Sequence, residues 1–225
     1  MTDEQTPAGA LAQVGLSRRR LLQAAAAAAA ITVPLAGASA AYASGDLVQD
    51  TLEAWADTIV PGAKRSLGDR VIAGATAGPG AVQAGAYALY QDPDVGIAVA
   101  LPALVALINA EALTYALGRL QLLDPTVPPF VALDLAGRTA VIESLLAAPS
   151  TLGLLWYALA ALAMLAFHTA AHLDTAAAIR AGHPGLAWIG FPAPDADGIW
   201  RFPAFSYGRV LAAPHPATTP TGNPA

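Results

Sequence analysis

The feature that most limits the possible folds is a long uncharged stretch in the second half of the chain. No acidic or basic residue lies between Glu143 and Asp174, and residues 152–167 are almost wholly apolar. A helix that is apolar on every side must be covered by other helices or by lipid. A membrane span needs about 20 apolar residues, and this core is shorter. We therefore predict the central helix of a bundle, with a membrane anchor over 151–173 as the alternative.

Helical spacing of apolar residues continues through most of the remaining chain. It predicts helices over 46–60, 81–91, 104–123, 134–148 and 151–180, and a short helix opening at 66–69. Asp134 is the expected N-cap of the fourth of these. No alternating run is long enough for a strand. The predicted fold class is all-α, a helical bundle with a long apolar central helix and an irregular, aromatic and Pro-rich C-terminal segment.

Residues 1–43 have the plan of an export signal. A polar start leads to Ser-Arg-Arg-Arg-Leu-Leu at 17–22, an alanine-rich run, and A-x-A cleavage sites at 38–40 and 41–43. The pattern resembles a twin-arginine (Tat) signal, with the candidate export residues Ser17, Arg18, Arg19, Leu21 and Leu22. We expect the Tat translocase to carry the folded chain to the cell envelope, the periplasm or the outside. The Sec route, an ordinary N-terminal helix and an uncleaved anchor are the alternatives.

The composition excludes several classes of function. The chain has no cysteine, which excludes disulfides, iron–sulfur clusters, c-type haem attachment and thiol catalysis. Its formal net charge of -5 gives no basic footprint for nucleic acid. Residues 44–183 are expected to form the helical domain, residues 184–215 the irregular segment and residues 216–225 a disordered tail.

Two histidines form the one constellation that suggests a metal site. His168 and His172 are four residues apart, which would place both rings on one helix face. A third ligand would have to come from Glu111 or Glu143 on another helix. The metalloprotease, ferritin-like, dinucleotide-binding and nucleophile-elbow motifs are all absent from the sequence. The alternative is that the two histidines mark the point where the central helix leaves the core.

Aromatic side chains gather near the C-terminus, interleaved with proline. They are Trp188, Phe191, Trp200, Phe202, Phe205 and Tyr207. Such side chains either pack back on the bundle or dock on a partner, where Trp and Tyr dominate binding energy. Both interpretations stay open, and these six residues are the candidate partner interface.

The stretch Leu-Glu-Ala-Trp-Ala-Asp-Thr-Ile-Val-Pro-Gly at 52–62 resembles the opening of a known family. That family is the small subunit, subunit 3, of gluconate 2-dehydrogenase-type complexes. Phe130, Leu133, Arg138 and Leu145 also resemble a later helix of that family. The resemblance implies an all-helical, non-catalytic companion of a large flavin-dependent dehydrogenase or oxidase of the glucose–methanol–choline type. That partner would carry FAD and leave the cytoplasm on the small subunit's signal.

The sequence therefore predicts an accessory and escort subunit without a cofactor or an active site of its own. Trp55 and the aromatic segment are expected to stabilise the complex or the fold. The alternatives are a metal-binding envelope enzyme built on His168 and His172, and a membrane-anchored structural protein that uses the helix over 151–173.

Overall fold

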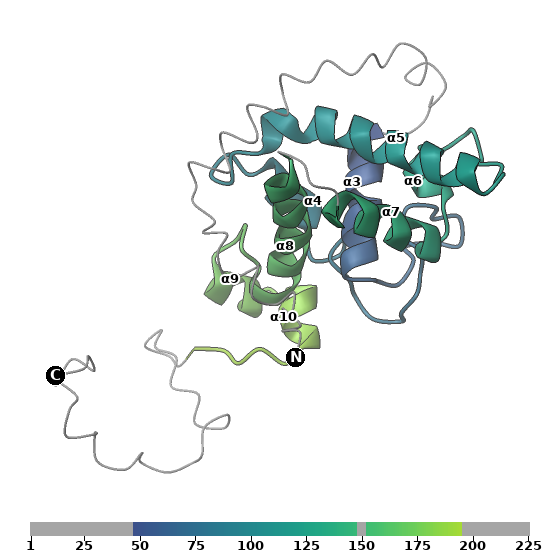
Figure 1. The fold of residues 1–225 in the computed structure, drawn as a ribbon. Helices are drawn as coiled ribbons and strands as arrows, with labels where there is room; N and C mark the ends of the chain where they lie inside the picture. The colour runs from purple at the N-terminus through teal and green to yellow at the C-terminus, as the bar shows by residue number, and fades with distance from the viewer. Residues whose placement is uncertain (1–46, 148–151, 195–225) are drawn as a thin grey trace, which may run out of the picture. The chain divides into compact units, whose positions relative to one another are not determined.

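A computed structural model describes residues 47–147 and 152–194 of the chain (Figure 1). The predicted export residues and the aromatic residues beyond position 194 lie outside these ranges. No strand occurs in the described part, so the all-α prediction is confirmed. The helices are α3 (Leu47–Ile59), α4 (Ala86–Gln91), a 3-10 turn η1 (Ala98–Ala100), α5 (Leu101–Gly118), α6 (Pro129–Ala132), α7 (Leu135–Ala147), α8 (Gly153–Thr169), α9 (Thr175–Arg180) and α10 (Pro184–Trp188).

The core forms around α3, which packs against α4, α5, α6, α7 and α8. Leu52 and Trp55 on this helix are fully buried. The Trp55 ring lies between those of Phe130 and Trp156, at centroid distances of 6.3 and 5.9 Å. Aromatic pairs at such distances add to the stabilisation from burial. Trp55 therefore stabilises the fold of this chain.

The longest helix of the described residues is α5, with 18 residues, and not α8, with 17. Pro102 lies in its first turn, where the missing backbone N–H of proline removes no helical hydrogen bond. Residues 98–118 are the one described stretch that is long and apolar enough to cross a membrane. Core helices of other proteins meet the same criterion, and Leu104, Ile108 and Ala112 of this stretch are buried in the domain.

The predicted single helix over 151–180 is wrong, because α8 ends at Thr169. Ala170 takes a left-handed conformation with φ 51°, and α9 begins five residues later. The break folds the chain back on itself, so that Ala170, Ala178 and Leu186 bury one another in a second, smaller cluster. The helix over 151–173 that the membrane-anchor alternative requires is therefore not formed, and α8 has 17 residues.

Other predicted boundaries hold or fail for local reasons. Asp134 caps α7 as predicted, accepting a hydrogen bond from the Gly137 N–H at 2.8 Å. No helix forms at 66–69, where the chain makes a turn. The helix predicted over 81–91 begins only at Ala86, because Gly85 is left-handed with φ 85°. The segment expected to be irregular from 184 opens with α10, which His183 caps.

Candidate functional site

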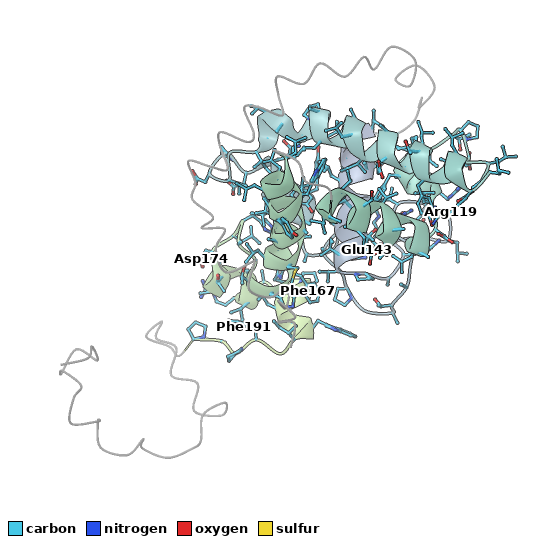
Figure 2. The ribbon with its side chains drawn as sticks, in the orientation of Figure 1. Arg119, Glu143, Phe167, Asp174 and Phe191 are labelled. Atoms are coloured by element: carbon cyan, nitrogen blue, oxygen red, sulfur yellow. The ribbon has the colours of Figure 1, made fainter. Side chains whose placement is uncertain are left out.

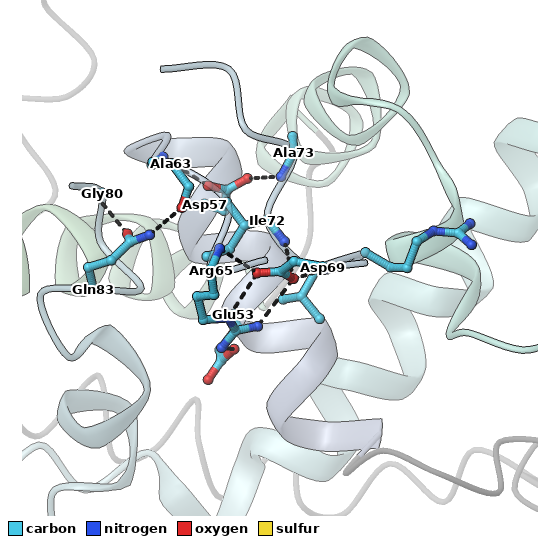
Figure 3. Close-up of polar contacts among 12 residues, drawn as sticks. Glu53, Asp57, Ala63, Arg65, Asp69, Ile72, Ala73, Gly80 and Gln83 are labelled. Atoms are coloured by element: carbon cyan, nitrogen blue, oxygen red, sulfur yellow. Dashed lines mark hydrogen bonds and ion pairs between the residues drawn. The ribbon is translucent and has the colours of Figure 1, made fainter. Parts of the chain in front are cut away.

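Buried carboxylates on α3 and in the loop after it organise the long connection between α3 and α4 (Figure 3). Asp57 is fully buried. Its carboxylate accepts hydrogen bonds from the backbone N–H of Gly62 at 3.0 Å and of Ala73 at 2.8 Å. Burial raises the pKa of Asp57, and the two N–H donors oppose that rise. Asp57, which belongs to the 52–62 motif, therefore holds both ends of the loop segment from Gly62 to Ala73.

A second carboxylate, Asp69, holds the same loop through Arg65. Nε of Arg65 donates to Asp69 at 2.9 Å, and Nη1 of Arg65 donates to Glu53 on α3 at 2.7 Å (Figure 3). Asp69 also accepts from the backbone N–H of Val71 and Ile72. Burial would raise the pKa of Asp69, but the bonds from Arg65 and the backbone outweigh it and lower that pKa.

Gln83 and Gly80 fix the point where the loop returns to α3. The Gln83 side chain donates to the Ala63 carbonyl at 2.6 Å and accepts from the Gly80 N–H at 2.8 Å (Figure 3). A Cβ at position 80 would collide with the Val60 carbonyl oxygen. This close crossing of two backbone segments therefore requires glycine at position 80.

Arg138 of α7 joins this loop to the segment before α7. The side chain is buried, and its guanidinium donates to four backbone carbonyl oxygens at 2.5 to 3.0 Å. The acceptors are those of Arg70, Val71, Val131 and Leu133. Burial lowers the pKa of Arg138 to about 10, against the attraction of Asp57. The Arg138 guanidinium thus holds the two loop segments together through hydrogen bonds to their backbone carbonyl oxygens.

A pocket of about 430 Å³ opens beside Arg138. Its polar lining consists of Lys64, Arg70, Asp134 and Arg138. Arg70 pairs with Asp124 at 2.9 Å, Asp134 caps α7, and Arg138 binds carbonyls. Of the groups that could act as a base or a nucleophile, the lining holds the Asp134 carboxylate, which caps α7, and the Lys64 amine.

The structure does not place the two candidate metal-binding histidines on one helix face. His168 is exposed on α8, with Nδ1 at 2.9 Å from the Met164 carbonyl. His172 follows the helix break and faces His183, with 6.3 Å between ring centroids. Burial and His183 lower the pKa of His172. The spacing argument fails because α8 ends at Thr169, and no three potential metal ligands gather within the described ranges. Glu111 instead accepts from the Ser144 hydroxyl at 2.7 Å.

One face of α8 is apolar and exposed. Tyr157, Ala161, Met164 and Leu165, here called the α8 face, recur at the four- and three-residue spacing of a single helix surface. The opposite side is fully packed, with Leu155, Leu159 and Ala166 completely buried. Sequence reasoning missed this face, because a helix that is apolar all round gives no sign of which side its neighbours leave uncovered.

Two members of the predicted aromatic interface lie within the described residues. Trp188 ends α10 with 65% of its surface exposed, and its indole lies against Gly78. Phe191 packs beside the small cluster formed by Ala170, Ala178 and Leu186. Figure 2 shows Phe191 where the chain leaves α10. Trp200, Phe202, Phe205 and Tyr207 lie outside the described residues.

Comparison with known proteins places the chain in a family. Residues 46–225, four-fifths of the chain, match DUF5987, described as a family of unknown function. The chain belongs to the DUF5987 family. No curated protein and no solved structure matches it. The matched range begins just after the predicted export signal and includes every helix described above.

Proposed function

We propose that this DUF5987 protein is a non-catalytic accessory and escort subunit. It accompanies and stabilises a large flavin-dependent oxidoreductase of the glucose–methanol–choline type, which carries the FAD. The observation that carries the proposal is the exposed α8 face, an uncharged apolar strip on a helix whose opposite side packs into the core. The resemblance of residues 52–62 to the small subunits of such complexes supplies the kind of partner.

The chemistry of the α8 face suits a stable protein interface. The buried centres of such interfaces are depleted of charge and enriched in aromatic residues and Met. Tyr157 and Met164 are of this kind, and α8 carries no Asp, Glu, Lys or Arg, its one basic residue being His168 in the last turn. Trp188 is exposed on α10, which packs directly against α8. An exposed tryptophan is a typical source of binding energy and adds a second candidate contact to the α8 face.

The described polar groups support a structural role. Four charged side chains are buried among the described residues. Glu53 pairs with Arg65, and the other three are Asp57, Asp69 and Arg138. Each of them binds backbone groups of this same chain, which leaves them committed to holding the loop between α3 and α4. A domain whose buried charges maintain its own loops is suited to binding a catalytic partner.

The predicted Tat signal supplies the escort part of the proposal. The Tat translocase accepts folded cargo, so a chain that binds its partner in the cytoplasm could take that partner through the same export step. Replacing Arg18 and Arg19 by Lys should then retain both proteins in the cytoplasm. Export of the flavoprotein in that variant would contradict the escort role.

The proposal is tested by recovering the tagged full chain from its native host in mild detergent. We expect a yellow complex whose absorbance spectrum is that of a flavoprotein, with the large subunit identified by mass spectrometry. The double variant Met164→Lys with Leu165→Lys should come down without the flavoprotein, because two buried charges in the interface would be unpaired. A colourless chain that comes down alone would refute the proposal.

The matched control is Leu67→Lys. Leu67 is a fully exposed leucine in the loop after α3, on a different element from the α8 face. This variant should retain the flavoprotein at the wild-type level. Equal loss in the control and the double variant would show that added positive charge, and not the α8 face, governs the association.

A further inference from the structure

We propose that the C-terminal end of α5 binds the surface of a phospholipid bilayer. Three leucines within six residues, Leu117, Leu120 and Leu122, are 74%, 94% and 97% exposed. We call them the leucine tip. Single exposed apolar residues are common on soluble proteins, but a close group of large ones marks an interaction site. The leucine tip is separate from the α8 face.

The backbone at the leucine tip is held in a conformation that disfavours leucine. Leu120 has φ 54°, in the left-handed region. The Gln121 N–H donates to the Ala116 carbonyl at 2.9 Å and the Leu120 N–H to the Leu117 carbonyl at 3.1 Å, which closes the helix end. Glycine is the usual residue at such a position. Leu120 gains almost no burial within the chain in return, so folding alone does not account for it.

Tyr115 and Arg119 each lie within two residues of Leu117 along the chain. The Arg119 guanidinium lies 3.7 Å from the centre of the Tyr115 ring. No carboxylate forms an ion pair with Arg119 in the described part of the chain. Tyrosine and arginine behind an apolar end form the pattern of side chains that lie at the level of lipid headgroups. Arg119 is thus placed to pair with a lipid phosphate when the leucines enter the acyl region.

The position of the leucine tip favours a bilayer over a protein pocket. Figures 1 and 2 show the end of α5, with Arg119, at the periphery of the helical domain. A projecting end needs a matching cavity in a protein partner, whereas a bilayer accepts any small apolar projection. The first half of α5 stays packed, since Leu101, Leu104 and Ile108 are fully buried. The interaction is therefore peripheral, with α5 resting on the membrane and not spanning it.

The absence of cysteine from the chain allows a site-specific test. Leu122→Cys and, as the control, Leu67→Cys are each labelled with an environment-sensitive fluorophore in the full chain. Vesicles of phosphatidylcholine with phosphatidylglycerol are then added. The fluorescence emission of the probe at position 122 should shift to shorter wavelength. The emission of the probe at position 67 should not shift, because that probe stays in water. The export signal is present in both variants, so any binding through it cannot produce this difference.

A second measurement separates insertion from an effect of the label. Burying one leucine changes a partition constant by roughly tenfold or more. Leu117→Ser combined with Leu120→Gly should therefore weaken insertion of the labelled tip about a hundredfold. Glycine suits the left-handed position, so this variant retains the helix end. An unshifted probe at position 122, an undiminished response in the double variant, or a shift produced only by a protein partner would overturn the proposal.

Discussion

Replacing Arg138 by Met tests whether one buried guanidinium joins two loops of the domain. The substitution keeps most of the side-chain volume but removes all the donors to the carbonyl oxygens of Arg70, Val71, Val131 and Leu133. Three of those four acceptor residues are buried, so water cannot readily replace the lost bonds. Arg70 is the exposed residue of the four, so water can most readily replace the bond to its carbonyl.

The magnitude follows from the three buried carbonyls. Leaving a buried acceptor unpaired costs about 1 kcal/mol at the low end of the measured range. The sum is a loss of about 3 kcal/mol in the free energy of unfolding. In a domain of this size each 1 kcal/mol lowers the melting temperature by about 2–4 °C, so a decrease of about 6–12 °C is expected. Arg138→Lys keeps the charge but not the planar fork of donors. Its free energy of unfolding should lie between those of the wild type and Arg138→Met.

The assay is urea unfolding followed by far-ultraviolet circular dichroism and tryptophan fluorescence, with coincident curves as the check for two-state behaviour. The control is Arg180→Met, which removes an exposed arginine from α9 and should change the free energy of unfolding by no more than about 0.5 kcal/mol. If Arg138→Met also unfolds within about 0.5 kcal/mol of the wild type, the carbonyls have other partners and the reasoning is wrong.

Three further substitutions test the helix end at Leu120, the close contact at Gly185 and the carboxylate of Asp69. Leu120→Gly should raise the free energy of unfolding by up to about 1 kcal/mol in urea titrations, because glycine relieves the left-handed strain; a decrease would contradict the strain. Gly185→Ala should lower it by about 1–3 kcal/mol, because the new Cβ would collide with the Phe167 carbonyl, whereas Gly153→Ala, with open space around it, should have little effect. Asp69 has a lowered pKa, so its stabilisation is present above the unfolded value of 3.8 and is lost as the pH falls through the lower folded value. Asp69→Asn should therefore show a shallower loss of stability than the wild type between about pH 5 and about pH 2, and equal slopes would rule this contribution out.

The sequence predicted the helices whose ends carry local signals. Asp134 precedes α7 and caps it. The helix predicted over 46–60 from apolar spacing is α3. The short helix expected at 66–69 does not form, because the Asp69 carboxylate binds Arg65 and the backbone of the turn that follows. A short acidic side chain can start a helix or make such contacts, and only the position of Arg65 decides between them.

The predicted site depended on contacts that no local pattern encodes. The pairing of His168 with His172 assumed that one helix continued through both, and residues 169–173 contain no glycine or proline to signal a break. The chain turns at Ala170 because α9 and α10 then bury that residue against Leu186. Arg138 is part of the pattern that resembles the small-subunit family, but its four carbonyl partners come from two segments that are distant in the sequence.

The sequence by itself determined the helical class of the described residues and the absence of thiol chemistry. Both follow from local properties, namely the spacing of apolar residues along a helix and the residue types present. The tertiary structure alone decided where α8 ends and which apolar side chains remain exposed on the α8 face and the leucine tip. Exposure depends on how neighbouring helices cover each side of an apolar helix, and those neighbours are distant in the sequence.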